Sequence, residues 1–186
     1  MMSNVNKLGK NIAFYYYGDD HMIINIYNYI KGCIKDNVYV YLNIEDRLYN
    51  LLYNFLEDTE KLMVCNKTID NITLNSDFEA IKEFLARYRD NKIESGFSDV
   101  RFVIDVKGII NSSGKVLFKE LSNSLYDICL YNNMTVLMLY DFGNYMNNGK
   151  IIDKDIIKLS YINHSHRMFA DDIIPIEEFM NNTNLA

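Results

Sequence analysis

The segment Asn11–Leu42, NIAFYYYGDDHMIINIYNYIKGCIKDNVYVYL, decides the fold class, because two runs of β-branched and aromatic residues flank a helical pattern. The runs Asn11–Tyr17 and Val38–Leu42 predict two strands. After the turn Gly18–Asp20, apolar residues recur at three- and four-residue intervals and predict a helix: Met22, Ile23, Ile26, Tyr27 and Ile30. A strand, a helix and a second strand in this order are typical of a βαβ unit in a parallel sheet.

The same alternation continues along the chain, so we predict an α/β fold. Further strands are predicted at Leu62–Cys65, Val100–Val106, Thr135–Tyr140 and Arg167–Ala170. A helix after Asp46 has an apolar face of Leu48, Leu51, Leu52 and Phe55. Another opens with a capping box of Ser76 and Glu79, carries Phe78, Ile81, Phe84, Leu85 and Tyr88, and ends near Gly96. Later helices are predicted at Lys115–Asn132 and near Asp153–Tyr161, with a last amphipathic turn after Pro175.

Length and composition indicate one globular domain. The chain has 186 residues, of which 49% are hydrophobic and 24% charged. This is enough for one core and too little for two ordinary domains, so we predict a single domain, 1–186, with its core at about 11–170 and a C-terminal extension at 171–186. Cys33, Cys65 and Cys129 are odd in number and widely spaced, and we expect them to be free, small and buried.

Charge and hydropathy exclude several classes of partner. The net charge of −6 works against contact with a phosphate backbone, so we expect no direct binding to nucleic acid. No apolar run is long enough to span a membrane, and the N-terminal MMSNVNKLGK lacks the apolar stretch of a secretory signal. We therefore expect a cytoplasmic protein without a membrane partner.

Acidic residues follow the predicted strands, and ligands of parallel α/β sheets bind at the carboxyl ends of strands. The candidate ligand-binding residues there are Tyr17, Asp19, Asp20, His21, Glu45, Asp105 and Asp141. Of the consecutive rings of Tyr15, Tyr16 and Tyr17, at least one is expected to reach this crevice, because neighbouring strand residues point to opposite faces. The acids have a structural alternative, since each could instead cap the helix or turn that follows it.

Two motifs resemble parts of a nucleotide site. Phe102–Asp105 has the form of a Walker B strand, whose Asp holds magnesium. Gly108–Lys115 is similar to a phosphate loop, but five residues instead of four separate its glycines, and Val116 replaces the hydroxyl residue that would bind magnesium. We interpret it as a coincidence. After the first strand, where such a loop would be expected, Asp19 and Asp20 would repel a triphosphate.

The sequence predicts no metal and no cofactor. His164 and His166 would share one face of a strand, which suits a metal, but no third ligand is evident near them. No Ser, His and Asp set or Cys and His pair is recognisable, so no catalytic residues are assigned.

From about Asn11 to Phe169 the chain resembles the MEDS domain, the sensory domain named for methanogen and methylotroph proteins and the DcmR regulator. The segments that carry the resemblance are Asn11–Leu52, VRFVIDV with the long helix after it, LMLYDFGNY (Leu137–Tyr145) and INHSHRMF (Ile162–Phe169). Tyr140, Asp141 and His164 match the Tyr-Asp signature of the family and its later histidine, which adds Tyr140 and His164 to the candidate ligand-binding residues. One departure is Asn11, where the family often has a histidine.

The resemblance implies a three-layer, RecA/KaiC-like fold with a mostly parallel sheet, no phosphate loop and no ATPase activity. It also implies a sensory or regulatory role in signal transduction or transcriptional regulation, with a small organic ligand or a regulatory protein as partner.

Two other function classes stay open. One is a metal-dependent hydrolase or residual nucleotidase that uses the acidic crevice, with Glu45 as its acid. The other is a structural module that forms a homo-oligomer.

Overall fold

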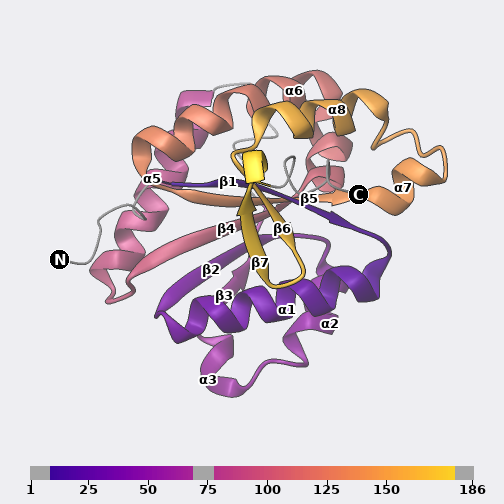
Figure 1. The fold of residues 1–186 in the computed structure, drawn as a ribbon. Helices are drawn as coiled ribbons and strands as arrows, with labels where there is room; N and C mark the ends of the chain where they lie inside the picture. The colour runs from indigo at the N-terminus through magenta and orange to yellow at the C-terminus, as the bar shows by residue number, and fades with distance from the viewer. Residues whose placement is uncertain (1–8, 69–77, 179–186) are drawn as a thin grey trace.

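A mostly parallel sheet organises the molecule (Figure 1). The computed structural model describes residues 9–68 and 78–178. These residues form a seven-stranded sheet in the order β3-β2-β4-β5-β1-β6-β7, in which only β7 is antiparallel to its neighbour. The strands are β1 (Asn11–Tyr16), β2 (Val38–Asn43), β3 (Val64–Asn66), β4 (Asp99–Asp105), β5 (Thr135–Asp141), β6 (His166–Phe169) and β7 (Asp172–Pro175).

Helices cover both faces of this sheet, which confirms the predicted three-layer α/β fold (Figure 1). On one face lie α5 (Phe78–Glu94), α6 (Val106–Asn132) and α8 (Lys154–Asn163), with the short α7 (Phe142–Met146) packed beside them. On the other face lie α1 (Asp19–Lys35) and α2 (Asp46–Tyr53), with α3 (Asp58–Lys61) following α2. No helix in the described part of the chain has both the length and the apolar character needed to cross a bilayer.

The strands supply both halves of the core because their side chains alternate between the two faces. In β2, Tyr39 and Tyr41 point toward α5, while Val40 and Leu42 point toward α1. The same alternation separates the residues of β5: Val136, Met138 and Tyr140 belong to the first cluster, and Leu137 and Leu139 to the second. Both faces of the central strands are therefore buried.

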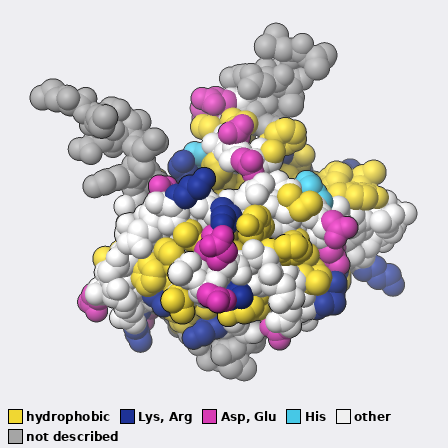
Figure 2. Space-filling view, turned by 90° about the horizontal axis from the view of Figure 1, so that it is seen from below, with side chains coloured by type: hydrophobic (Ala, Val, Ile, Leu, Met, Phe, Trp, Pro, Cys, Tyr) yellow, Lys and Arg dark blue, Asp and Glu magenta, His cyan; other side chains and the backbone are white. Residues whose placement is uncertain are grey.

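Several predicted elements are shifted. The third strand is Val64–Asn66 instead of Leu62–Cys65, and Leu62 is exposed. Leu51 and Phe55 were wrongly placed on the apolar face of α2, since 41% and 63% of their surfaces are accessible. Figure 2 views the molecule from this α1–α2 side and shows hydrophobic side chains interspersed with basic and acidic ones. The predicted cap Ser76 lies outside the described residues.

Two elements were missed. The helix predicted from Lys115 already begins at Val106 and is interrupted at Gly114, whose φ of 82° lies in the left-handed region that glycine tolerates. The strand β7 falls in the predicted C-terminal extension but pairs with β6, with His166 opposite Pro175. The sheet therefore continues beyond the predicted core.

The buried ring of Phe102 provides a test of this packing. Phe102 is fully buried on β4, with Tyr41 and Tyr88 at ring-centroid distances of 5.7 and 6.2 Å. Phe102→Ala should lower the free energy of unfolding by about 3–5 kcal/mol, because it leaves a cavity between the sheet and α5. Urea denaturation measures the change. The matched control Val116→Ala, at an exposed position of α6, should change it by less than about 0.5 kcal/mol; similar losses in both variants would contradict the packing described.

Candidate functional site

The carboxyl ends of four parallel strands bring most of the predicted acids together. In the register of the sheet, Tyr16 at the end of β1 lies opposite Asp141 at the end of β5, and Asp105 at the end of β4 lies opposite Leu139. The hydroxyl of Tyr16 is within electrostatic range of four carboxylates, and burial together with these negative charges raises its pKa. The four are Asp105, Asp141, Asp19 and Glu45. We call this group the acidic edge.

Asp105 is the most deeply buried of these carboxylates. Its Oδ1 and Oδ2 accept hydrogen bonds from the backbone N–H groups of Lys107 (3.3 Å) and Gly108 (3.1 Å), so it caps α6. Burial raises the pKa of Asp105 to about 6, and the two backbone hydrogen bonds offset only part of that effect. Asp105 therefore caps a helix, as the structural alternative predicted, and burial also holds its pKa well above the ordinary value of 3.8.

Asp141 has a similar double role. Its Oδ1 accepts a hydrogen bond from the backbone N–H of Asn144 (2.8 Å) and caps α7, while its Oδ2 lies 3.6 Å from the Nζ of Lys107. A Cβ at Gly143 would lie only 3.2 Å from Oδ1, so glycine permits the tight turn. A Cβ at Gly143 would also lie 3.8 Å from the ring of Tyr17. The turn after β5 therefore lies beside the end of β1.

Solvent-exposed ion pairs connect the start of α1 with the start of α2 at the acidic edge. Arg47 on α2 lies 2.7 Å from the carboxylate of Asp19 and 3.3 Å from that of Glu45. Arg47 was not predicted as a site residue, because its position in the first turn of α2 gave no sign that it reaches across to α1. It connects the acids that follow β1 and β2.

The turn between β1 and α1 differs from the capping arrangement considered from the sequence. The N-cap of α1 is Gly18, and neither Asp19 nor Asp20 forms a capping hydrogen bond, although both lie in the first turn, where a negative charge favours the helix dipole. The Nδ1 of His21 accepts a hydrogen bond from the backbone N–H of Tyr17 (3.0 Å). The ring of Tyr17, 62% exposed, stands free at this corner.

Tyr140 and His164 lie in the core and do not join the acidic edge. Tyr140 is fully buried and stacks on Tyr15 at a centroid distance of 5.5 Å, and His164 meets the edge of the Tyr140 ring at 5.6 Å. The Nδ1 of His164 donates to the carbonyl oxygen of Ser160 (2.9 Å), which can only accept. Burial lowers the pKa of His164 to about 4, because a buried imidazolium is poorly solvated.

The segment similar to a phosphate loop is part of a helix. Residues 108–113 lie within α6, where their backbone N–H groups belong to the helix, and the side chain of Lys115 pairs with Asp153 on the far side of the Gly114 interruption. This geometry agrees with the interpretation of the motif as a coincidence. Within the described ranges, no group of three or more His, Cys, Asp or Glu side chains is arranged to hold a metal ion.

Comparison with known proteins identifies the fold. No protein-family model and no curated protein matches this sequence. The structure is similar to the KaiC-like protein PH0186 from Pyrococcus horikoshii, with 13% identity and a TM-score of 0.53 over 86% of this chain and 70% of that one. It is also similar to the flagellar accessory protein FlaH from Methanocaldococcus jannaschii, with 9% identity and a TM-score of 0.54 over 90% and 76% of the two chains. The chain therefore has the RecA/KaiC-like fold that its resemblance implied.

The raised pKa of Asp105 predicts a pH-dependent contribution to stability. This pKa lies above the ordinary value of 3.8, so the folded state holds the proton of Asp105 more tightly than the unfolded state does. Ionisation of Asp105 therefore lowers the free energy of unfolding as the pH rises from about 4 to 7. A pKa of about 6 instead of 3.8 corresponds to roughly 3 kcal/mol in the free energy of unfolding. Asp105→Asn can still cap α6 and cannot ionise. The free energy of unfolding of Asp105→Asn minus that of the native protein should therefore increase as the pH rises from about 4 to 7.

Urea denaturation at a series of pH values measures this difference. Protonation of His164 has the opposite effect, because it lowers the free energy of unfolding as the pH falls below 6.5. This contribution is present in both proteins, so it cancels in the difference between them. A difference between the two proteins that stays constant from pH 4 to pH 7 would show that Asp105 titrates as an ordinary surface acid.

Proposed function

We propose that this chain is a non-catalytic regulatory domain that binds a small organic ligand or a protein partner at the acidic edge. The observation that carries the proposal is the turn between β1 and α1. A phosphate-binding turn at such a position would offer backbone N–H groups and a lysine to the phosphates. Here Gly18 is followed by Asp19 and Asp20, and the carboxylate of Asp19 holds the nearby cation Arg47.

The charges of the acidic edge favour a ligand other than a nucleotide. Both cations described there already face carboxylates: Arg47 faces Asp19 and Glu45, and Lys107 faces Asp141. A triphosphate would meet repulsion at this edge, whereas a ligand or partner that presents a cation or hydrogen-bond donors would be attracted. The exposed ring of Tyr17 adds an apolar surface beside the carboxylates.

The resemblance to the MEDS domain supports the same proposal. It implies a sensory domain in signal transduction or transcriptional regulation, which would transmit ligand binding through association with another protein. Tyr140 and His164 are buried, so we propose a packing role for these two signature residues and infer that the binding residues are those of the acidic edge and the β1–α1 turn.

A second candidate function is hydrolysis, and one observation favours it. A buried carboxyl group with a pKa of about 6, as at Asp105, is typical of general acid–base residues. In this alternative Asp105 or Glu45 would activate water for attack on a substrate.

Phosphate-release assays and native mass spectrometry, each with and without magnesium and ATP, separate the two functions. We expect no ATP turnover above background, no specific magnesium–nucleotide adduct, and no effect of Glu45→Gln, because the acidic turn repels the triphosphate. Glu94→Gln, an exposed position at the end of α5, is the matched control. Turnover that disappears in Glu45→Gln but persists in Glu94→Gln would overturn the proposal in favour of hydrolysis. A copurified organic mass or protein that is lost in Asp141→Ala would support the proposal.

A further inference from the structure

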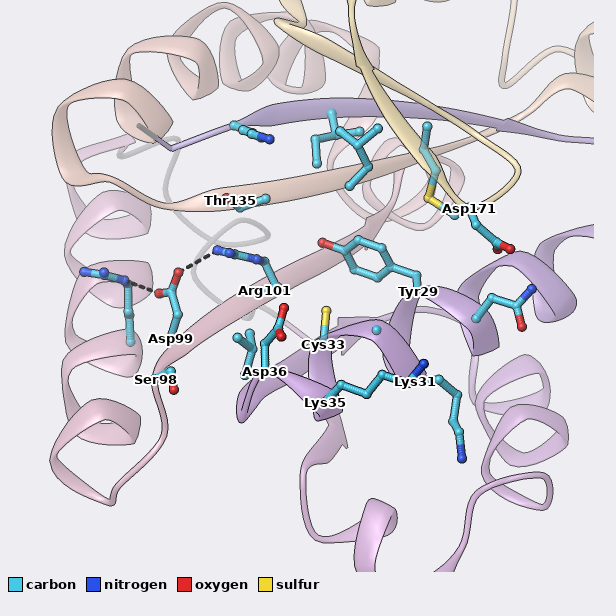
Figure 3. A pocket seen from close by; sticks show the side chains of 18 of the residues that line it. Tyr29, Lys31, Cys33, Lys35, Asp36, Ser98, Asp99, Arg101, Thr135 and Asp171 are labelled. Atoms are coloured by element: carbon cyan, nitrogen blue, oxygen red, sulfur yellow. Dashed lines mark hydrogen bonds and ion pairs between the residues drawn. The ribbon is translucent and has the colours of Figure 1, made fainter. Parts of the chain in front are cut away.

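A cavity lies at the end of the sheet opposite to the acidic edge, where the parallel strands begin. Its volume is about 900 Å³, within the range of pockets for small organic molecules. Its lining comes from the first residues of four strands and from the last turns of α1 (Figure 3). Ile12, Val38, Arg101 and Thr135 represent β1, β2, β4 and β5, respectively. Because ligands of parallel sheets ordinarily bind at the carboxyl ends of strands, the fold itself does not predict a site here.

The charge of this cavity is opposite to that of the acidic edge. Five basic and three acidic side chains line it, in a chain with a net charge of −6. The basic ones are Lys10, Lys31, Lys35, Arg89 and Arg101, and the acidic ones are Asp36, Asp99 and Asp171. Lys31 is ion-paired with Glu60, which lies outside the lining, so four basic side chains remain against three acidic ones. This balance is still positive and favours an anionic ligand.

One carboxylate orients two guanidinium groups at the wall of the cavity. The Oδ1 of Asp99 lies 2.6 Å from the Nε of Arg89, and its Oδ2 lies 2.6 Å from the Nη1 of Arg101 (Figure 3). Two cations sharing one anion leave a net positive charge, and the shared anion holds both planar groups in place. An oriented guanidinium suits the planar, two-oxygen geometry of a carboxylate.

The hydroxyl of Tyr29 adds a hydrogen-bond donor close to Arg101. Its oxygen is buried, and the Tyr29 side chain projects from α1 into the cavity (Figure 3). Its side-chain hydrogen-bonding neighbour is the thiol of Cys33, a weak hydrogen-bonding group, while Arg101 and Asp99 lie within electrostatic range. Burial raises the pKa of Tyr29, so the group stays a neutral phenol that can donate its proton to a ligand oxygen.

Aliphatic side chains form another part of the lining. Ile173 from the β6–β7 hairpin is half-buried, Val38 at the start of β2 and Met168 of β6 keep a small accessible surface, and Ile12 of β1 is fully buried behind them. Together with the polar wall, they make the cavity amphipathic. Such a cavity fits a molecule that has one charged group and a hydrocarbon body.

We propose that this cavity binds a small amphipathic carboxylate, whose carboxylate group contacts Arg101 and Tyr29 and whose hydrocarbon body packs on the aliphatic lining. A singly charged carboxylate suits the cavity better than a doubly charged phosphate, because Asp36 and Asp171 line it as well. The site is separate from the acidic edge, so this proposal does not rest on what binds there.

Isothermal titration calorimetry with octanoate and with benzoate tests the site in the full-length protein. At least one of the two should bind, and Arg101→Gln should weaken that binding by about tenfold or more. Tyr29→Phe should weaken it by roughly three- to tenfold while the melting temperature stays equal or rises, because this change removes a buried hydroxyl that has only a weak partner. Arg87→Gln, at an exposed position of α5 outside the cavity lining, is the control and should bind the carboxylate as the native sequence does.

Four results would overturn the proposal. The first is that the native protein binds neither carboxylate. The second is that folded Arg101→Gln and Tyr29→Phe proteins bind as tightly as the native one. The third is that the uncharged octanamide binds as tightly as octanoate. The fourth is that inorganic phosphate binds more tightly than both carboxylates, which would make the cavity a phosphate site. These titrations contain no nucleotide or magnesium, so their failure would leave the proposal for the acidic edge unaffected.

Discussion

The structure depends on the pairing of parallel strands whose two faces are both apolar. Such strands are stable only when helices cover both sides, because an uncovered face would expose a continuous row of large hydrophobic side chains to water. In β2 and β5 the alternating side chains form two separate clusters, one under α5, α6 and α8 and the other under α1 and α2. The positions of all these helices follow from this requirement.

Covering both faces leaves the ends of the strands as the places where polar groups can gather. The register of β1, β4 and β5 brings acids from distant parts of the sequence to one end, where Asp105 and Asp141 cap the following helices. At the other end, the first residues of β4 and the last turns of α1 bring Arg101 and Tyr29 together. The two ends therefore have opposite electrostatic character within one acidic protein.

The sequence predicted the acidic edge better than the cavity, for a physical reason. An acid that ends an apolar strand, such as Asp105, must lie at the carboxyl edge of a parallel sheet. No comparable rule covers residues at the starts of strands, so nothing in the sequence singled out Arg101 or Tyr29. Tyr140 precedes Asp141 by one residue, but its side chain points to the opposite side of the strand, where packing against α8 buries it. Burial of that kind depends on tertiary contacts that sequence periodicity does not contain.

The two outer strands have a consequence for how copies of this chain could associate. At one side of the sheet β3 has only three residues, and at the other side β7 begins with a charged Asp172 and ends with Pro175, which has no N–H to donate. Short, charged or proline-containing outer strands resist pairing with strands of another molecule. Within the described sheet, neither outer strand therefore favours pairing with a strand of another copy, which protects the sheet from edge-to-edge growth and amyloid-like stacking.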